Sequence, residues 1–431
     1  MTADADVLIV GAGPAGATAA RVLALGGARV RLIDRHHFPR SKPCGGAITT
    51  RALNRFPHLR PALGEIATHY LSRLYLQGPS GAAVTLSSPT PAVLMIRRIE
   101  FDALLVRLAQ EAGAELVEGV EVSRAAVGEG GVEVAGREGR RFRAPLVIAA
   151  DGVNSVIARR LGFNRGWPAA SVALDMMEEA PNDALRATAP NTLWVSYGYD
   201  GSDGYGYVFP KRDHTNVGIG YVLSFFRERV KEHPYDLQRR FVAALRDRGA
   251  IEGESRREHF TPYLIPVGGP LDRTAKGPVL LVGDAGGFVN AYTAEGIYYA
   301  MISGDLAARA ILEKGGAEQA AGPDRDGGRR PGPAGGSPAT RYESSWKREI
   351  GAELADSRLI QRFLFRDRSR IDRVVSRARA CPDIAALIVG YASGEVSYLE
   401  ARRRVLTRFP KVGLRFAISH LLGRLAGAPG C

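Results

Sequence analysis

A glycine-rich turn near the N-terminus constrains the fold of this chain more than any other feature. Residues 7–34 read VLIVGAGPAGATAARVLALGGARVRLID. The apolar run Val7–Val10 predicts a short buried strand, and Gly11, Gly13 and Gly16 follow it directly as G-x-G-x-x-G. In such a turn the first glycine makes the tight bend, the second lets the backbone approach a pyrophosphate, and the third lets the next helix pack closely on the strand.

The residues after the turn complete the pattern. A helix is expected from about Pro14, and its N-terminus would offer free N–H groups and a positive dipole end to phosphates. A second strand, Arg29–Ile33, ends in Asp34, whose carboxylate can accept hydrogen bonds from both hydroxyls of an adenosine ribose. Because strand, helix, second strand and acid follow in order, the segment favours dinucleotide binding over a merely structural glycine turn.

Two later segments repeat the sequence of apolar strand, turn and helix. The apolar run Leu146–Ala150 leads into Asp151 and Gly152, and Val279–Val282 leads into Gly283 and Asp284. The three turns in order are much more specific than any one of them. They indicate a nucleotide-binding domain whose last piece returns late in the chain.

We predict an α/β (α+β) fold in which a Rossmann-like dinucleotide-binding domain carries an inserted antiparallel-sheet domain and is followed by a helical C-terminal region. Dense aromatic residues and alternation between residues 166 and 272 favour the antiparallel sheet. One strand is expected over Leu71–Leu76, and a helix from near Thr49. The predicted boundaries are 1–65, 92–165 and 273–314 for the nucleotide-binding domain, 66–91 and 166–272 for the substrate domain, 315–340 for a flexible low-complexity insertion, and 341–431 for the helical region.

Composition narrows the possible partners. The net charge is +13, and residues 341–431 hold 18 Lys and Arg against 9 Asp and Glu. This excess fits a solvated helical face or a surface attracted to anionic lipid or phosphorylated substrates, and Lys411–Leu425 is a candidate basic amphipathic helix. No nucleic-acid recognition motif accompanies it, so nucleic acid is not expected as a partner.

Neither a signal peptide nor a spanning helix is expected, since no run of about 18 uninterrupted apolar residues occurs. The three cysteines are too scattered for a disulfide frame or a zinc site, and the histidines show no ligand spacing, so no metal is expected. A cytoplasmic location follows, with peripheral contact at the inner membrane face as an extension. The sequence does not predict the oligomeric state.

Three motifs give the chain a resemblance to the FAD-dependent geranylgeranyl reductase family, in the aromatic-hydroxylase-like flavoprotein superfamily. Residues 42–48, KPCGGAI, resemble the family's cysteine loop, and residues 283–301 match its third motif closely. Residues 202–210 resemble P-x-x-Y-x-W-x-F-P, except that Ser202 replaces the first proline and Tyr207 the tryptophan.

The resemblance implies FAD as cofactor and assigns residues to it. Asp284 would hold the ribityl chain, Gly296 and Ile297 at a helix N-terminus would face the flavin pyrimidine edge, and Arg98 would contact the phosphates unless it is simply a surface arginine. Val122 would meet the adenine through its backbone. The complete set implied by motifs and resemblance is Gly11, Gly13, Ala15, Gly16, Asp34, Arg35, Cys44, Gly45, Gly46, Arg98, Val122, Asp151, Gly152, Gly283, Asp284, Gly296 and Ile297.

The family reduces carbon–carbon double bonds of isoprenoid chains, which predicts an isoprenoid or lipid-like substrate. Protonation of an isolated alkene before hydride transfer would create a cation that needs a dry pocket with aromatic faces. Substrate contacts are therefore expected from Trp194, Tyr205, Tyr207 and Phe209, although these residues could equally be sheet core. Cys44, Tyr205 and Tyr207 are the candidate proton donors, and the alternative for Cys44 is a small packing residue.

No second G-x-G-x-x-G is present for a nicotinamide cofactor. The resemblance implies that the FAD is reduced by NAD(P)H that binds transiently or by another donor, and NAD(P)H is the expected one. The alternative enzyme class is an FAD monooxygenase or halogenase, which shares the fold and the turns at Asp151 and Asp284. The tryptophan-rich W-x-W-x-I-P segment of halogenases is absent. A flavin-binding partner protein without turnover is the non-catalytic alternative.

Overall fold

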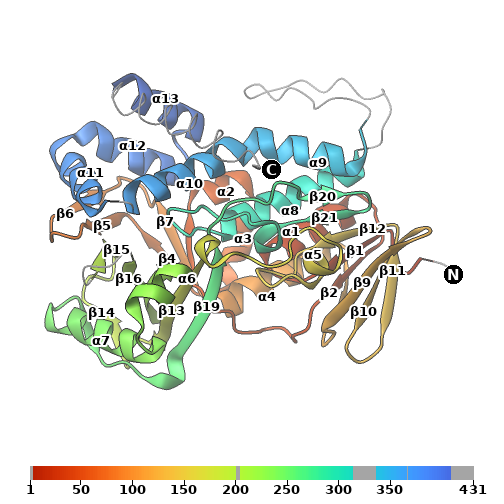
Figure 1. The fold of residues 1–431 in the computed structure, drawn as a ribbon, viewed down its shortest axis with the longest axis horizontal. Coiled ribbons are helices and arrows are strands. Elements are labelled where there is room, and N and C mark those ends of the chain that lie inside the picture. Colours follow the sequence, from red (N-terminus) through yellow and green to blue (C-terminus); the bar gives the residue numbers. More distant parts are fainter. Residues whose placement is uncertain (1–2, 200–203, 314–335, 366, 409–431) are drawn as a thin grey trace.

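The computed structural model describes residues 3–199, 204–313, 336–365 and 367–408. The candidate helix Lys411–Leu425, residue Ser202 and most of the low-complexity insertion lie outside these ranges. Figure 1 shows a nucleotide-binding half, which contains β1 and α1, beside a half built on a large antiparallel sheet and covered by C-terminal helices.

The nucleotide-binding half is built on a six-stranded sheet in the order β20-β21-β12-β1-β2-β8. Strands β21, β12, β1, β2 and β8 run parallel to one another, and the edge strand β20 is antiparallel to β21. Continuous apolar runs form the inner strands because both faces are covered. The strands are β1 (Val7–Val10), β2 (Val30–Ile33), β8 (Glu115–Val117), β12 (Leu146–Ala149), β20 (Ala275–Lys276) and β21 (Val279–Leu281).

Helices α1 (Pro14–Leu25), α4 (Arg98–Glu111) and α8 (Ile297–Leu312) share one core with this sheet. Small residues permit their close approach: a Cβ on Gly304 of α8 would lie 2.2 Å from the Ala15 carbonyl oxygen of α1. A three-stranded antiparallel sheet covers the other face, formed by β9 (Val122–Gly128), β10 (Gly131–Gly136) and β11 (Arg141–Ala144). The short helix α5 (Val156–Arg160) packs beside it.

The second half is a seven-stranded sheet in the order β19-β13-β17-β16-β15-β5-β6. All of its pairings are antiparallel except that of β15 with β5. The strands are β5 (Arg73–Gln77), β6 (Ala83–Ser87), β13 (Val172–Pro181), β15 (Thr192–Tyr197), β16 (Tyr205–Pro210), β17 (His214–Val222) and β19 (Phe260–Pro266). A separate pair joins β14 (Leu185–Ala187) to β18 (Ile251–Gly253).

Each face of this sheet has its own cover. Helix α7 (Pro234–Asp247) packs on the face that presents Met176 and Val208, and a short helix, α6 (Leu223–Phe225), follows β17. The opposite face presents Val195 and Tyr207 to the C-terminal helices, which Figure 1 shows in blue. The C-terminal helices are α9 (Pro338–Trp346), α10 (Ala352–Phe365), α11 (Arg368–Ala380), α12 (Pro382–Ser393) and α13 (Tyr398–Arg408). Helices α10 and α11 meet this face of the sheet, whereas α9 packs in the core of the nucleotide-binding half.

The predicted fold class is confirmed, and two local predictions need correction. The expected strand Leu71–Leu76 is two strands in different sheets, since the chain breaks at Ser72 between β4 (Thr68–Leu71) and β5. The expected helix near Thr49 begins later, as α2 (Arg51–Arg55), after the strand β3 (Ala47–Thr49). Strands β3 and β4 flank β7 (Val93–Ile96), and α3 (Leu59–Ala62) follows α2.

No helix among the described residues is long and apolar enough to cross a membrane. Nor do those residues contain a group of three or more His, Cys, Asp and Glu side chains arranged to hold a metal ion.

Candidate functional site

One cavity of about 1170 Å³ joins the two halves of the molecule. At one end it is lined by the turns that follow β1, β2, β12 and β21, because the carboxyl ends of parallel strands meet at one edge of a sheet. At the other end it lies between the seven-stranded sheet and helices α10–α13. Its volume exceeds the roughly 300–1,000 Å³ typical of a site for one drug-sized ligand, so it has room for a cofactor and a second molecule.

The three glycines of the first turn have different structural roles. Gly11 has φ +100°, and a Cβ there would lie 2.2 Å from the Ala150 carbonyl oxygen. A Cβ on Gly16 would lie 1.9 Å from the Gly11 carbonyl oxygen. At Gly13 the nearest protein atom is Arg40 Nη2, 3.8 Å away. The fold therefore requires glycine at the first and third positions, whereas the space at Gly13, which lines the cavity, is left for a ligand.

Asp34 lies at the same end of the cavity and is 8% exposed. Its Oδ2 accepts a hydrogen bond from the Ala12 N–H (2.8 Å) and its Oδ1 accepts one from the His36 N–H (2.9 Å). Each oxygen keeps a lone pair that could accept a ribose hydroxyl. Arg35 and Val122 line the cavity beside it, so the structure brings the predicted adenosine-side residues together.

Arg98 lines the cavity, but its guanidinium already has a carboxylate partner. Its Nε and Nη2 lie 2.6 and 2.7 Å from the Asp102 oxygens, and Arg40 Nη1 lies 2.9 Å from the same carboxylate. Burial alone would lower the pKa of Arg98, and the Asp102 carboxylate raises it above its usual range. Arg40, which sequence reasoning missed, is the cation that lies beside Gly13.

Asp151 and Gly152 reach the cavity in the turn after β12. The Asp151 carboxylate accepts hydrogen bonds from the Val156 N–H (2.7 Å) and the Ser155 hydroxyl (2.5 Å), so it caps α5. Burial raises its pKa, and these hydrogen bonds oppose that shift. Its observed role is to fix the turn, while Gly152 with φ +80° lets the chain change direction.

Asp284 is the acid that is left free at the centre of the cavity. It follows Gly283, which has φ +56°, and within the described residues its carboxylate has neither a hydrogen bond nor an ion pair. Burial raises its pKa, while Lys42 and Arg98 act in the opposite direction. An unpartnered buried acceptor that lines a cavity fits the hydroxyl-rich ribityl chain of FAD. Gly296 and Ile297, at the start of α8, line the cavity nearby.

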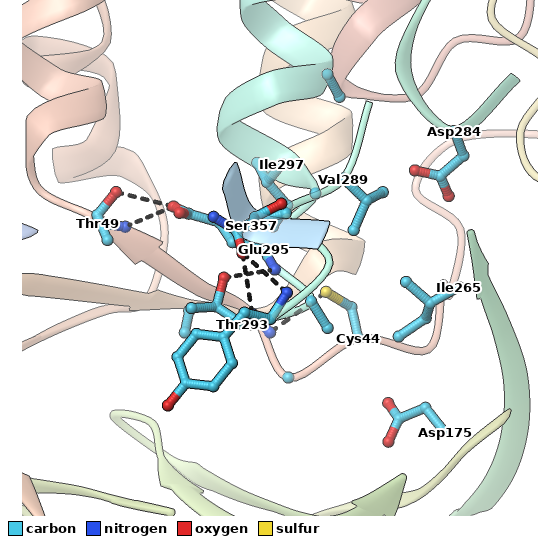
Figure 2. A pocket seen from close by; sticks show the side chains of 18 of the residues that line it. Cys44, Thr49, Asp175, Ile265, Asp284, Val289, Thr293, Glu295, Ile297 and Ser357 are labelled. Carbon is cyan, nitrogen blue, oxygen red and sulfur yellow. Dashed lines mark hydrogen bonds between the residues drawn. The ribbon is translucent and has the colours of Figure 1, made fainter. Parts of the chain in front are cut away.

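The cysteine loop crosses the middle of the cavity, where Figure 2 shows Cys44 between Asp284 and Asp175. The Cys44 sulfur accepts a weak hydrogen bond from the Gly46 N–H at 3.4 Å. The two positions after Cys44 require glycine, because a Cβ on Gly45 would lie 2.7 Å from the Phe209 ring and one on Gly46 would lie 2.1 Å from the Ile96 carbonyl oxygen. The loop is therefore held against the aromatic wall.

Lys42, at the start of this loop, was not predicted as a site residue. Its ammonium lies 3.2 Å from the centroid of the Tyr263 ring. Burial, followed by the positive charge of Arg98, lowers the pKa of Lys42 to about 8. The sequence offered only a lysine next to proline in a loop, and no pattern there indicates a buried cation.

The aromatic wall comes from β16, whose residues Tyr205, Tyr207 and Phe209 all line the cavity. Trp194 of β15 does not line the cavity. It pairs with Val208 of β16, its ring stacks on Tyr75 with the centroids 5.9 Å apart, and it packs beside Phe241 of α7. The structure thus places it in the core on the far face of the sheet, and we drop it from the substrate contacts.

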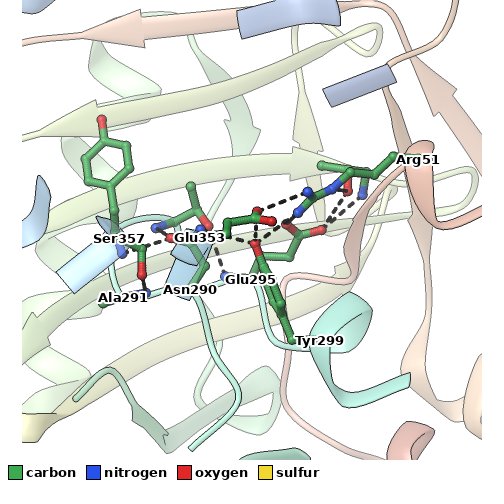
Figure 3. A network of polar contacts seen from close by, with 10 residues as sticks. Arg51, Asn290, Ala291, Glu295, Tyr299, Glu353 and Ser357 are labelled. Carbon is green, nitrogen blue, oxygen red and sulfur yellow. Dashed lines mark hydrogen bonds and ion pairs between the residues drawn. The ribbon is translucent and has the colours of Figure 1, made fainter. Parts of the chain in front are cut away.

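A buried polar network fixes the C-terminal cover to the cofactor end of the cavity (Figure 3). Arg51 of α2 contacts Glu353 of α10 through Nη1 (3.0 Å) and Glu295, which precedes α8, through Nη2 (3.2 Å). The same Nη2 donates to the Tyr299 hydroxyl at 3.0 Å. Tyr391 of α12 stacks over the guanidinium, with Cζ 4.4 Å from its ring centroid.

The chain is similar to known flavoproteins. Residues 4–311 match the family model of the FAD binding domain. The chain is 33% identical over 324 residues to a geranylgeranyl diphosphate reductase of Oryza sativa, covering 71% of this chain and 66% of that protein. It is 30% identical over 370 residues to digeranylgeranylglycerophospholipid reductase 2 of Methanothermobacter thermautotrophicus, covering 83% of this chain and 87% of that protein.

A crystal structure of a geranylgeranyl bacteriochlorophyll reductase-like protein from Thermoplasma acidophilum has the same fold. The TM-score is 0.76 at 21% identity, over 96% of this chain and 99% of that one. With the FAD binding domain spanning most of the chain, and with relatives at 30% identity or more over most of their length, the chain belongs to the FAD-dependent geranylgeranyl reductase family of flavoprotein oxidoreductases.

Proposed function

We propose that this protein reduces carbon–carbon double bonds in the prenyl chain of an isoprenoid or lipid-like molecule. The observation that carries the proposal is the single cavity that connects the glycine turn and Asp284 with an apolar compartment under the C-terminal helices. When bound, FAD supplies the hydride in its reduced form. Gly13, Asp34, Arg40 and Asp284 would hold it in the first part of that cavity.

The apolar compartment suits a long hydrocarbon chain. Val195 and Tyr197 on the sheet face Leu364 of α10 and Val375 of α11 across it, and these residues belong to one apolar cluster. Burying a prenyl chain there gains about 0.8 kcal/mol for each methylene removed from water. The same residues exclude water, and the tyrosine faces attract the positive charge that develops when an alkene is protonated.

Cys44 would act near the reacting carbon, and the position of its loop between Asp284 and the aromatic wall of the cavity supports this role. A Cys44→Ser enzyme should lose turnover or change the absorption spectrum of the bound flavin. Serine replaces the thiol by a hydroxyl of similar size, so the variant should fold, and its thermal midpoint serves as the control. An unchanged spectrum together with unchanged turnover would remove Cys44 from the site and leave it as a packing residue.

NAD(P)H is the proposed electron donor, and anionic membrane is the proposed source of substrate. Helices α11 and α13 carry exposed arginines, including Arg373 and Arg403, beside the exposed apolar side chains of Val374 (42%) and Leu399 (60%). Such a surface attracts anionic lipid headgroups. Flotation with anionic vesicles at low salt tests this: we expect binding that is lost with neutral vesicles, and failure to float with the anionic ones would reject peripheral contact at the inner membrane face.

The decisive experiment combines the purified yellow protein with a reductant and candidate prenyl compounds, followed by mass spectrometry. Reduction adds the mass of two hydrogen atoms for each double bond. A product heavier by one oxygen atom would instead identify a monooxygenase, and one containing halogen a halogenase. Bound FAD that no donor and acceptor pair turns over would favour the non-catalytic reading, and a colourless protein that refuses FAD would refute the whole proposal.

A further inference from the structure

We propose that Asp175 and Tyr207 form a proton-donating pair in which Asp175 stores the proton and the Tyr207 hydroxyl delivers it to the substrate alkene. This inference rests on the proposed function and names the acid that the reaction requires. Asp175 was not indicated by any sequence motif. It is 7% exposed on β13, lines the cavity and belongs to the sheet face that carries the aromatic wall.

The pair is made possible by a glycine on the strand between its members. Strand β17 separates β13 from β16 in the sheet. Gly218 of β17 is directly opposite Tyr207 of β16, and a Cβ on Gly218 would lie 2.2 Å from the Tyr207 hydroxyl oxygen. The tyrosine ring therefore crosses over the neighbouring strand at a position where glycine leaves room for it. Its hydroxyl donates to Asp175 Oδ2 at 3.1 Å and lies 3.3 Å from Oδ1.

The surroundings of Asp175 favour its protonated form. Within the described residues the carboxyl makes no ion pair, and Tyr207 is its hydrogen-bond partner. Tyr263 of β19 is paired directly opposite it, and Tyr205 of β16 is the other phenol near it. Burial raises the pKa of Asp175 to about 7 and outweighs the Tyr207 hydrogen bond and the charge of the nearby Lys42, which both favour the carboxylate.

Tyr207 alone is a poor acid. Burial, and then the negative charge of Asp175, raise its pKa well above the ordinary value of a phenol. A phenol that loses its proton to an alkene must recover one in the same step, and a protonated Asp175 within hydrogen-bond distance can supply it. Cys44 and Tyr205, which also line the cavity, lack such a carboxyl partner within the described residues.

The step balances as follows. In the protonated pair the Asp175 carboxyl donates a hydrogen bond to the Tyr207 oxygen, and the Tyr207 proton turns towards the alkene. A new carbon–hydrogen bond then forms to the alkene as the Tyr207 oxygen–hydrogen bond breaks, and the Asp175 proton passes to the Tyr207 oxygen. The hydride that the bound cofactor provides completes the saturated bond. Asp175 is left as a carboxylate and regains a proton from water after the product leaves.

Infrared spectroscopy of the full chain tests whether Asp175 is protonated, and it requires no turnover. A buried protonated carboxyl has its own carbonyl stretching band. We expect the spectrum of the wild type minus that of Asp175→Asn to contain this band at pH 5.5 and to lose it by pH 9, with a midpoint near 7. Asparagine can still accept from the Tyr207 hydroxyl, so the fold is preserved. Absence of the band from the difference spectrum at pH 5.5 would overturn the proposal.

Two glycine variants on one strand test the delivery. Gly218→Ala pushes the Tyr207 hydroxyl away from Asp175. Gly220→Ala, two residues along on the same face, is the matched control: its Cβ would meet Asp175 Oδ1 and the Tyr205 ring at an ordinary 3.7 Å, which leaves the Tyr207 hydroxyl in place. General acid catalysis contributes about 10²–10⁴-fold. We expect the rate of prenyl reduction to fall by that factor in Asp175→Asn and in Gly218→Ala. The wild type should lose activity above pH 7 as Asp175 loses its proton, and Gly220→Ala should keep both the wild-type rate and this pH dependence.

The rate at which the donor reduces the bound flavin separates proton delivery from a general structural defect, and it should be unchanged in all three variants. Equal effects of the two glycine variants on prenyl reduction would refute the crossing as the delivery route. If the wild type reduces no prenyl compound, the proposed function fails, and the infrared band still decides whether Asp175 stores a proton.

Discussion

Replacing Gly13 by alanine should weaken FAD binding without unfolding the protein. The residue has φ −74° and ψ −174°, a conformation that alanine adopts freely, and the new Cβ would have no protein atom closer than 3.8 Å. Losing glycine at a helix N-cap costs on the order of 1 kcal/mol or less. The thermal midpoint of the FAD-free protein should therefore change little.

The cost falls on the ligand because the same Cβ points into the space left for the pyrophosphate. Forcing one extra methyl into a close-packed contact costs about 1–3 kcal/mol. At 1.4 kcal/mol for each factor of ten, this weakens FAD binding by about 5- to 140-fold. Titration of FAD-free protein with FAD, followed by quenching of flavin fluorescence, measures the change.

Gly16→Ala is the matched control for this prediction, since its Cβ would lie 1.9 Å from the Gly11 carbonyl oxygen. That variant should lose thermal stability whether or not FAD is present. The reasoning fails if Gly13→Ala binds FAD as tightly as the wild type, or if it loses as much stability as Gly16→Ala.

Three further predictions concern buried groups. Asp102→Asn leaves Arg98 without its carboxylate and should lower the free energy of unfolding in urea by about 3–5 kcal/mol. A loss no larger than that of a surface substitution would refute the pairing. Trp194→Ala should cost a similar 3–5 kcal/mol in the same assay while the KM for a prenyl substrate stays unchanged, since the ring lies outside the cavity; a raised KM would contradict that placement. The Asp175 pKa, raised from 3.8 to about 7, means that the folded protein binds the extra proton between these values. Stability should therefore fall as pH rises from about 4 to 7, and urea titrations of Asp175→Asn should lack this part of the slope.

The sequence could predict the cofactor half because its turns combine a fixed spacing with residue types that have one structural use. Gly16 is required by a contact inside the local strand–turn–helix unit, because a Cβ there would meet the Gly11 carbonyl oxygen. Gly11 is required by its φ of +100° and by the Ala150 carbonyl oxygen at the end of the neighbouring strand. Arg40 was missed because it lies in an irregular loop. Its approach to Gly13 depends on where that loop folds back, which no periodicity reports.

The substrate half shows what alternation alone cannot decide. Tyr205, Tyr207 and Phe209 share a face of β16, as their spacing of two predicts. Trp194 lies on the next strand, and a shift of one residue in the pairing would move it to the opposite face. The actual register pairs it with Val208 and pairs Val195 with Tyr207, which puts Trp194 among the residues of the α7 side. Asp175 was missed because its contact with Tyr207 depends on the register of three strands, β13, β17 and β16.

The Arg51 network explains why the two halves of the cavity can act on one substrate. Glu295 fixes the loop before α8 at the cofactor end, and Glu353 fixes α10 at the apolar end. Both carboxylates are held by one guanidinium that is 8% exposed, and burial with opposite charges makes such a contact costly to break. The cover over the hydrocarbon compartment and the turn that faces the cofactor are therefore fixed by the same side chain. A reaction that requires a donor atom and a reacting carbon at contact distance depends on that kind of shared support.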